Sequence, residues 1–225
     1  MILFRRSPDH LSEIVPLWAG HTVVCIAGGP SLTAEQCAAV GVARLAGRVR
    51  VIGVNDAYRR APWADVLYFA DAKWWEWHKH RFDFIAFAGQ KCTISGTHYQ
   101  IRDGLVHVLK NGGVEGVSTD PRELRTGRNG GFQALNMAIL AGARRVLLLG
   151  YDARAVDGRR HWFGDHPKIE PDHIYNEYRA AFHKTAETIA AMGVQVINCS
   201  PDSAITCFEK APLESALADP SPALV

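Results

Sequence analysis

Residues 22–35 read TVVCIAGGPSLTAE, an apolar run that passes directly into two glycines, a proline and a serine. The run is apolar on both faces, which is typical of a central strand in a parallel sheet. The residues after it, Ser31, Thr33 and Glu35, are of the kinds that cap and begin a helix. A buried strand followed at once by a helix is the first half of a βαβ unit, so this stretch predicts an α/β fold.

The same alternation continues along the chain. Further apolar strand-like runs occupy residues 50–54, 145–150 and 194–199, with weaker ones at 65–70 and 105–109. Helical segments that each precede a strand are expected over residues 33–47, 129–143 and 174–192. Such an order gives a single doubly wound, mostly parallel sheet of the Rossmann type with helices on both faces. We expect one domain over residues 1–210 and a partly ordered tail over residues 211–225.

The composition is that of a globular domain and narrows the class of function. The 225 residues are 48% hydrophobic and 21% charged, with 25 Lys and Arg against 23 Asp and Glu. So balanced a charge gives no bulk attraction to nucleic acid, and no apolar run approaches the roughly 20 residues of a membrane-spanning helix. The five cysteines include no C-x-x-C pair, so free thiols are expected. We expect a cytoplasmic protein with no membrane partner.

Two glycine-rich turns ahead of helices are the strongest functional signals. Loops at the carboxyl ends of parallel strands form ligand sites, and the amides of a helix N-terminus attract phosphate. The candidate nucleotide-binding residues in these turns are Gly28, Gly29, Pro30 and Ser31 in the first, and Thr126, Gly127, Arg128 and Asn129 in the second. Either turn could instead be a tight connection with a capping residue, and Arg128 an exposed loop arginine.

The second predicted strand ends in Asn55 and Asp56, which would reach the same cleft. Asn55 could bind a base or ribose, or both residues could only turn the chain. Residues 73–82 interleave aromatic and basic side chains and predict an amphipathic helix. We expect this helix to pack against the core through Trp74, Trp77 and Arg81 while His78 and Lys79 face water. Acceptor binding is the alternative function for this segment.

Aspartate, histidine and arginine side chains are concentrated in the segment from residue 152 to residue 167. His161 and His166 could remove a proton from an acceptor at neutral pH, and Asp152 or Asp165 could orient a histidine or hold Mg²⁺. The arginines that could contact phosphate are Arg154, Arg159 and Arg160. The spacing of His161, Asp165 and His166 lacks the usual zinc-ligand geometry, and the histidines could also be solvated loop residues.

In order, the motifs GGPSL, VND, TGRNGG and LLLGYD resemble those of a Rossmann-like superfamily. It includes the archaeal 6-hydroxymethylpterin diphosphokinase-like proteins and the bacterial sialyltransferases with a CMP-linked donor. The resemblance spans about residues 23–199, and the segments APWADVLY and HWFGDHP are similar to those of tailed-phage and prophage proteins. It implies a phage-encoded protein with nucleotide binding at Gly28, Gly29, Pro30, Ser31, Asn55, Thr126 and Gly127. It also implies a histidine base, for which His161 is the nearest candidate and His166 the second.

The chain departs from the sialyltransferase pattern at two points. Ala27-Gly28 stands where those enzymes have an asparagine before the glycine, and the tyrosine pair for the leaving phosphate is missing. From the motifs and the resemblance together, we expect a transferase with a nucleotide or nucleotide-sugar donor. Glycosyl transfer is the leading reaction. The alternatives are Mg-ATP-dependent diphosphate or phosphoryl transfer and a non-catalytic nucleotide-binding phage protein. The sequence leaves the acceptor open among a sugar, a heterocycle, a modified DNA base and a protein.

Overall fold

The computed structural model describes residues 3–7, 10–95, 105–167 and 171–218, which fold around one nine-stranded sheet. Every strand pairing in that sheet is parallel. In spatial order the strands are β11 (Glu209–Lys210), β10 (Gln195–Asn198), β9 (Arg145–Leu149), β3 (Thr22–Ile26), β4 (Val49–Val54), β5 (Val66–Tyr68), β6 (Gln90–Ile94), β7 (Val106–Asn111) and β8 (Glu123–Leu124). The predicted α/β class, a Rossmann-like doubly wound sheet, is confirmed.

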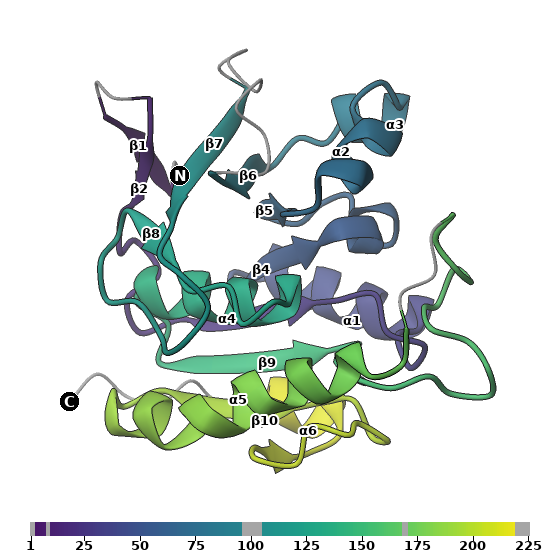
Figure 1. Ribbon diagram of the computed structural model, residues 1–225. Coiled ribbons are helices and arrows are strands. Elements are labelled where there is room, and N and C mark those ends of the chain that lie inside the picture. Colours follow the sequence, from purple (N-terminus) through teal and green to yellow (C-terminus); the bar gives the residue numbers. More distant parts are fainter. Residues whose placement is uncertain (1–2, 8–9, 96–104, 168–170, 219–225) are drawn as a thin grey trace.

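Helices cover both faces of the sheet, with α4 and α5 in front of it and α1 behind it in Figure 1. Val23 and Cys25 of β3 face α4 (Gly130–Leu140) and α5 (Ile174–Ala191). Val24 and Ile26 face the other layer, which consists of α1 (Ala34–Leu45), α2 (Ala72–His78), α3 (Phe82–Ile85) and α6 (Leu213–Ala218). All four side chains are fully buried, and each of the two valines and the isoleucine contributes about 1.5–3 kcal/mol of hydrophobic stabilisation.

The order of the strands creates a crevice at the carboxyl edge of the sheet. From β3 the chain proceeds outward through β4 to β8, and then α4 carries it back so that β9 pairs with the other side of β3. The connections that leave β3 and β9 therefore diverge to opposite sides. Such a switch point leaves room for a ligand beyond the strand ends.

Several elements were not predicted from the sequence. Strand β6 begins with polar residues, and β8 and β11 are only two residues long, so none of them gives an apolar run. Strands β1 (Phe4–Arg6) and β2 (Ser12–Ile14) form a separate antiparallel pair. Within the expected tail, α6 places Leu213 and Ala216 in the core, while residues 219–225 lie outside the described residues.

The five cysteines are free thiols, four of them buried. No helix in the described part of the chain is long and apolar enough to span a membrane.

The expected orientation of the helix over residues 73–82 is wrong in part. Trp74 is buried as predicted, but His78 is only 6% exposed and Trp77 is 36% exposed. Trp74 and His78 lie one helical turn apart, their rings stack with centroids 4.0 Å apart, and both contact the Asp56 carboxylate. This buried acceptor lies 22 residues away in the sequence and determines which face of α2 turns inward.

Candidate functional site

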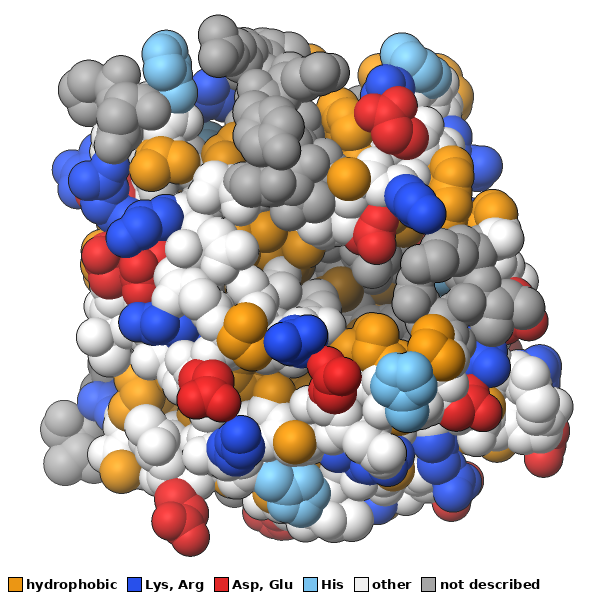
Figure 2. All heavy atoms as spheres, viewed as in Figure 1, with side chains coloured by type: hydrophobic (Ala, Val, Ile, Leu, Met, Phe, Trp, Pro, Cys, Tyr) orange, Lys and Arg blue, Asp and Glu red, His pale blue; other side chains and the backbone are white. Residues whose placement is uncertain are grey.

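A cleft opens at the carboxyl edge of β3, β4 and β9 and consists of two adjoining compartments of about 180 Å³ each. The first lies against the glycine turns, and the second lies against α2. In Figure 2 the surface is hollowed beyond the end of α4, with acidic and basic side chains on both sides of the hollow. The residues that line both compartments are Asn55, Arg160, His161, His166, Tyr175 and Tyr178.

The turn after β3 brings two loops into contact through Gly29. Its amide donates to the carbonyl of Gly150 at 2.9 Å. A Cβ atom at Gly29 would lie 2.0 Å from Asp152 Oδ2 and 2.5 Å from the Gly150 carbonyl oxygen. At Gly28 the nearest atom to a Cβ would be His161 Nδ1 at 3.4 Å. Both glycines line the first compartment, and Gly29 is in addition required for the packing of the two loops.

Asp152 occupies the position at the first turn where a phosphate was expected. Its Oδ2 accepts from the amide of Ser31 at 3.2 Å and from the Ser31 hydroxyl at 2.8 Å. Thr33 caps α1 reciprocally with Gln36, at 3.1 Å and 3.0 Å. Burial raises the pKa of Asp152, whose buried Oδ1 has no hydrogen-bond partner among the described residues. Pro30 and Ser31 therefore shape the turn and do not line the cleft.

The second glycine turn presents the N-terminus of α4 to the first compartment. Asn129 caps this helix by accepting from the amide of Phe132 at 3.0 Å, and the backbones of Gly130 and Gly131 line the cavity. The positive end of the helix dipole favours an anion there. Thr126, Gly127 and Arg128 lie outside the two compartments.

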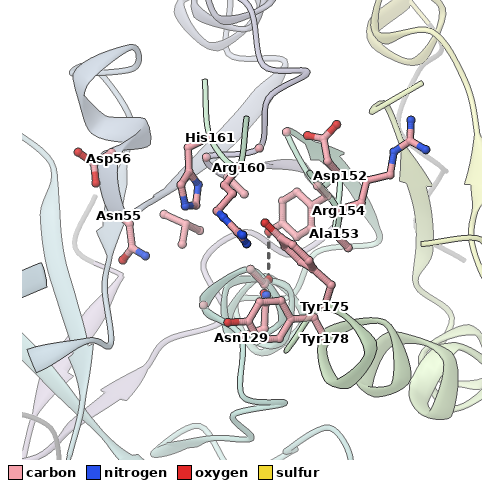
Figure 3. A pocket seen from close by; sticks show the side chains of 18 of the residues that line it. Asn55, Asp56, Asn129, Asp152, Ala153, Arg154, Arg160, His161, Tyr175 and Tyr178 are labelled. Carbon is pink, nitrogen blue, oxygen red and sulfur yellow. Dashed lines mark hydrogen bonds between the residues drawn. The ribbon is translucent and has the colours of Figure 1, made fainter. Parts of the chain in front are cut away.

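Asn55 and Asp56 have different surroundings and point in different directions (Figure 3). Asn55 has a left-handed backbone with φ +51°, and its buried Oδ1 has no hydrogen-bond partner in the part of the chain that the structure describes. Asp56 accepts from Trp74 Nε1 at 2.7 Å and contacts His78 Nε2 at 3.2 Å. Burial opposes ionisation of Asp56, but the hydrogen bonds from His78 and Trp74 hold its pKa at about 2. Asp56 is thus a structural acceptor, and Asn55 is the residue with unused hydrogen-bonding capacity.

His161 and His166 lie together between the compartments, with ring centroids 4.7 Å apart. His161 also stacks on Phe163 at 5.0 Å. Burial and the neighbouring His166 lower the pKa of His161 to about 4, and burial lowers the pKa of His166 as well. Both imidazoles are therefore neutral at pH 7, the form that can accept a proton.

One arginine that the sequence analysis missed ties the histidine segment to the two other loops of the site. The Arg60 guanidinium lies 4.0 Å from the centre of the Trp162 ring and donates to the carbonyl of Leu32. The Trp162 amide in turn donates to the carbonyl of Gly28 at 3.1 Å. Arg60 thus connects the turn after β3, the turn after β4 and the segment that carries His161. Its sequence signal is the Arg59-Arg60 pair that follows residues 55–58.

The three predicted phosphate arginines separate in the structure. Arg160 lines both compartments and pairs with Asp172 at 2.6 Å. Arg154 lines the first compartment, but its side chain extends away from the centre of the cleft in Figure 3. Arg159 is exposed outside both compartments.

The candidate metal ligands are also apart. Asp165 lines only the second compartment and Asp152 only the first. Among the described residues, no group of three or more His, Cys, Asp or Glu side chains is arranged to hold a metal ion. Tyr175 and Tyr178 on α5 complete the lining of the cleft and were not predicted from the sequence.

No family model, curated protein or solved structure matches the chain.

Proposed function

We propose that the chain is a group transferase with a nucleotide donor, and that glycosyl transfer is its leading reaction. The observation that carries the proposal is that three groups able to bind a ligand or accept a proton line the same cleft. These are the N-terminus of α4, the partnerless Oδ1 of Asn55 and the neutral imidazoles of His161 and His166. The first suits a phosphate, the second a ribose hydroxyl or a base N–H, and the third an acceptor proton.

In the proposed reaction the donor phosphate lies at Gly130 and Gly131, and Arg160, which lines both compartments, supplies a cation. His161 or His166 takes the proton of the acceptor hydroxyl while its oxygen forms a bond to the transferred sugar carbon. The bond between that carbon and the donor phosphate oxygen breaks, and its electron pair leaves with the phosphate. The helix N-terminus and Arg160 stabilise the charge that develops there.

Diphosphate or phosphoryl transfer from Mg-ATP is the second candidate, and Asp152 favours it. Asp152 lines the first compartment, and its buried Oδ1 has no hydrogen-bond partner among the described residues; carboxylate oxygens are preferred ligands of Mg²⁺. Since Asp165 lies in the other compartment, Mg²⁺ at Asp152 would take most of its remaining ligands from water and the phosphates.

A thermal-shift screen of CMP, CDP, UDP, GDP, ADP and ATP, each with and without Mg²⁺, tests the proposal. We expect a stabilising nucleotide whose effect is lost in Asn55→Ala and kept in the control Arg128→Gln, which lies outside the cleft. A shift without Mg²⁺ supports glycosyl transfer, and a shift only with ATP and Mg²⁺ supports the second candidate. His161→Gln and His166→Gln should keep binding, and at least one should lose turnover. Binding without turnover in the wild type would indicate a non-catalytic nucleotide-binding protein, and no shift with any nucleotide would refute the proposal.

A further inference from the structure

A second cavity lies at the opposite edge of the sheet, at the amino ends of β4, β5 and β6. We call it the Arg50 cavity; its volume is about 670 Å³. The side chains that matter in its lining are Trp18, Arg44, Arg50, Trp63, Asp65 and Gln90. It shares no lining residue with the cleft described above. Its volume lies within the range of roughly 300–1,000 Å³ that is usual for small-molecule sites.

The carboxylate in the Arg50 cavity already has other partners. Asp65 Oδ1 accepts from Arg44 Nε at 3.0 Å and from Arg44 Nη2 at 2.7 Å. Asp65 Oδ2 accepts from the amide of Val51 at 2.8 Å. Asp65 therefore neutralises Arg44 through a two-pronged ion pair, and no ion pair joins it to the second arginine of the cavity.

Arg50 is that second arginine. No hydrogen bond or ion pair joins its guanidinium to another described residue, and its Nε atom is buried. Gln90, the neutral acceptor nearby in the lining, already accepts from the amide of Leu3 at 2.7 Å. A partly buried cation without a counter-charge is unfavourable, so the Arg50 cavity has a position for an anion that the described residues do not fill.

Two tryptophans are part of the lining of the Arg50 cavity. Trp18 is 3% exposed, and its amide donates to the carbonyl of Ala141 at 2.9 Å. Trp63 packs closely on α1, where a Cβ atom at Gly41 would lie 3.1 Å from its ring. Burial of Trp18 and the packing of Trp63 on α1 restrict both rings before a ligand arrives, and indole surfaces favour planar rings over bare ions.

We propose that the Arg50 cavity binds an organic anion that consists of a flat ring carrying a carboxylate or a phosphate. The anionic group pairs with the guanidinium of Arg50, and the ring lies against the tryptophans. The proposal is independent of the nucleotide site, because the two cavities lie at opposite edges of the sheet and share no residue.

Isothermal titration of the full chain with simple probes tests this proposal. We expect phenyl phosphate or benzoate to bind in the millimolar range or more tightly, and the neutral isostere benzamide to bind at least about tenfold more weakly. Arg50→Gln should weaken binding by a similar factor, and the control Arg48→Gln should not, since Arg48 lies outside the lining and contacts the carbonyl of Leu217. A preference for phenyl phosphate would indicate a phosphorylated ligand, and a preference for benzoate would indicate an aromatic carboxylate.

A second readout needs no substitution. Burial and the charge of Arg50 together lower the pKa of His21. A bound anion would offset that charge, so the His21 imidazole should titrate at a higher pH with the bound probe than without it, as followed by proton NMR. Three results would overturn the proposal: no heat of binding with either anion at millimolar concentration, benzamide binding as tightly as benzoate, or an unchanged His21 titration with bound probe.

Discussion

Replacing either of two adjacent glycines, Gly28 or Gly29, by alanine should have very different effects on stability. Neither Gly28 nor Gly29 has a positive φ, so alanine is compatible with the backbone at both positions and only the surroundings differ. At Gly29 the new Cβ would lie 2.5 Å from the carbonyl oxygen of Gly150 and 2.0 Å from Asp152 Oδ2, whereas real Cβ contacts stay above 3.0 Å. The carbonyl must therefore retreat by at least 0.5 Å, the difference between 3.0 and 2.5 Å.

The cost of Gly29→Ala follows from these contacts. Overpacking of this kind costs about 1–3 kcal/mol, and losing one of the two hydrogen bonds from Ser31 to the displaced carboxylate adds about 1.5 kcal/mol. We expect a loss of about 3 kcal/mol, which lowers the melting temperature by about 6–12 °C at about 2–4 °C per kcal/mol for a chain of this size. Gly28→Ala makes only ordinary contacts and should change stability by less than about 0.5 kcal/mol.

Urea unfolding of the wild type and the two variants measures both values. The methyl group of Gly28→Ala would stand in the first compartment beside His161, so this variant should fold normally and bind nucleotide more weakly. Equal stability of the two variants would refute the reasoning, because it would mean that the contact between the β3 and β9 turns does not constrain Gly29.

Three further changes test the loops around the cleft. Arg60→Leu removes the guanidinium that packs on Trp162. Burial holds the pKa of His161 at about 4, and an NMR titration of this variant should show that pKa rising toward its usual 6.5. Arg60→Lys should raise it less, and an unchanged His161 pKa in both variants would contradict the role of Arg60. Between pH 6.5 and 4, His161 is protonated in the unfolded chain but stays neutral in the folded one. The free energy of unfolding should therefore decrease as the pH falls, by at most about 1.4 kcal/mol per pH unit. The slope in urea unfolding should be smaller in His161→Gln, and parallel profiles would contradict this. Asp56→Ala leaves the buried donors of Trp74 and His78 without an acceptor and should cost about 3–5 kcal/mol, more than Asp56→Asn; wild-type stability of Asp56→Ala would contradict the structural assignment.

The sequence predicted the fold well because its signal is local. Strands β3, β4 and β9 each contain a buried run of mostly apolar residues, and Thr33 and Asn129 cap α1 and α4 from positions next to the glycine turns. Strand β6 escaped prediction because Gln90–Ile94 begins with polar residues.

The details of the site depend instead on partners that are distant in the sequence. Ser31 and Asp152 are 121 residues apart, and His78 and Asp56 are 22 apart. The sequence could place two glycine turns at one sheet edge, but it could not indicate that Asp152 occupies the first of them or that His78 turns inward.

Because the Asp152 carboxylate occupies the first glycine turn, the two glycine turns differ as phosphate sites. A phosphate at the first turn would meet the Asp152 carboxylate, and it could bind only if that carboxylate moved away from Ser31 or took up a proton. Burial raises the pKa of Asp152, so binding at this turn would strengthen toward acid pH and depend on residue 152. At α4 the cap is an uncharged asparagine, and no carboxylate of a described residue is hydrogen-bonded to the first turn of the helix. A phosphate there would displace no such carboxylate, which is why we place the donor phosphate at Gly130 and Gly131 rather than at the motif that looks strongest in the sequence.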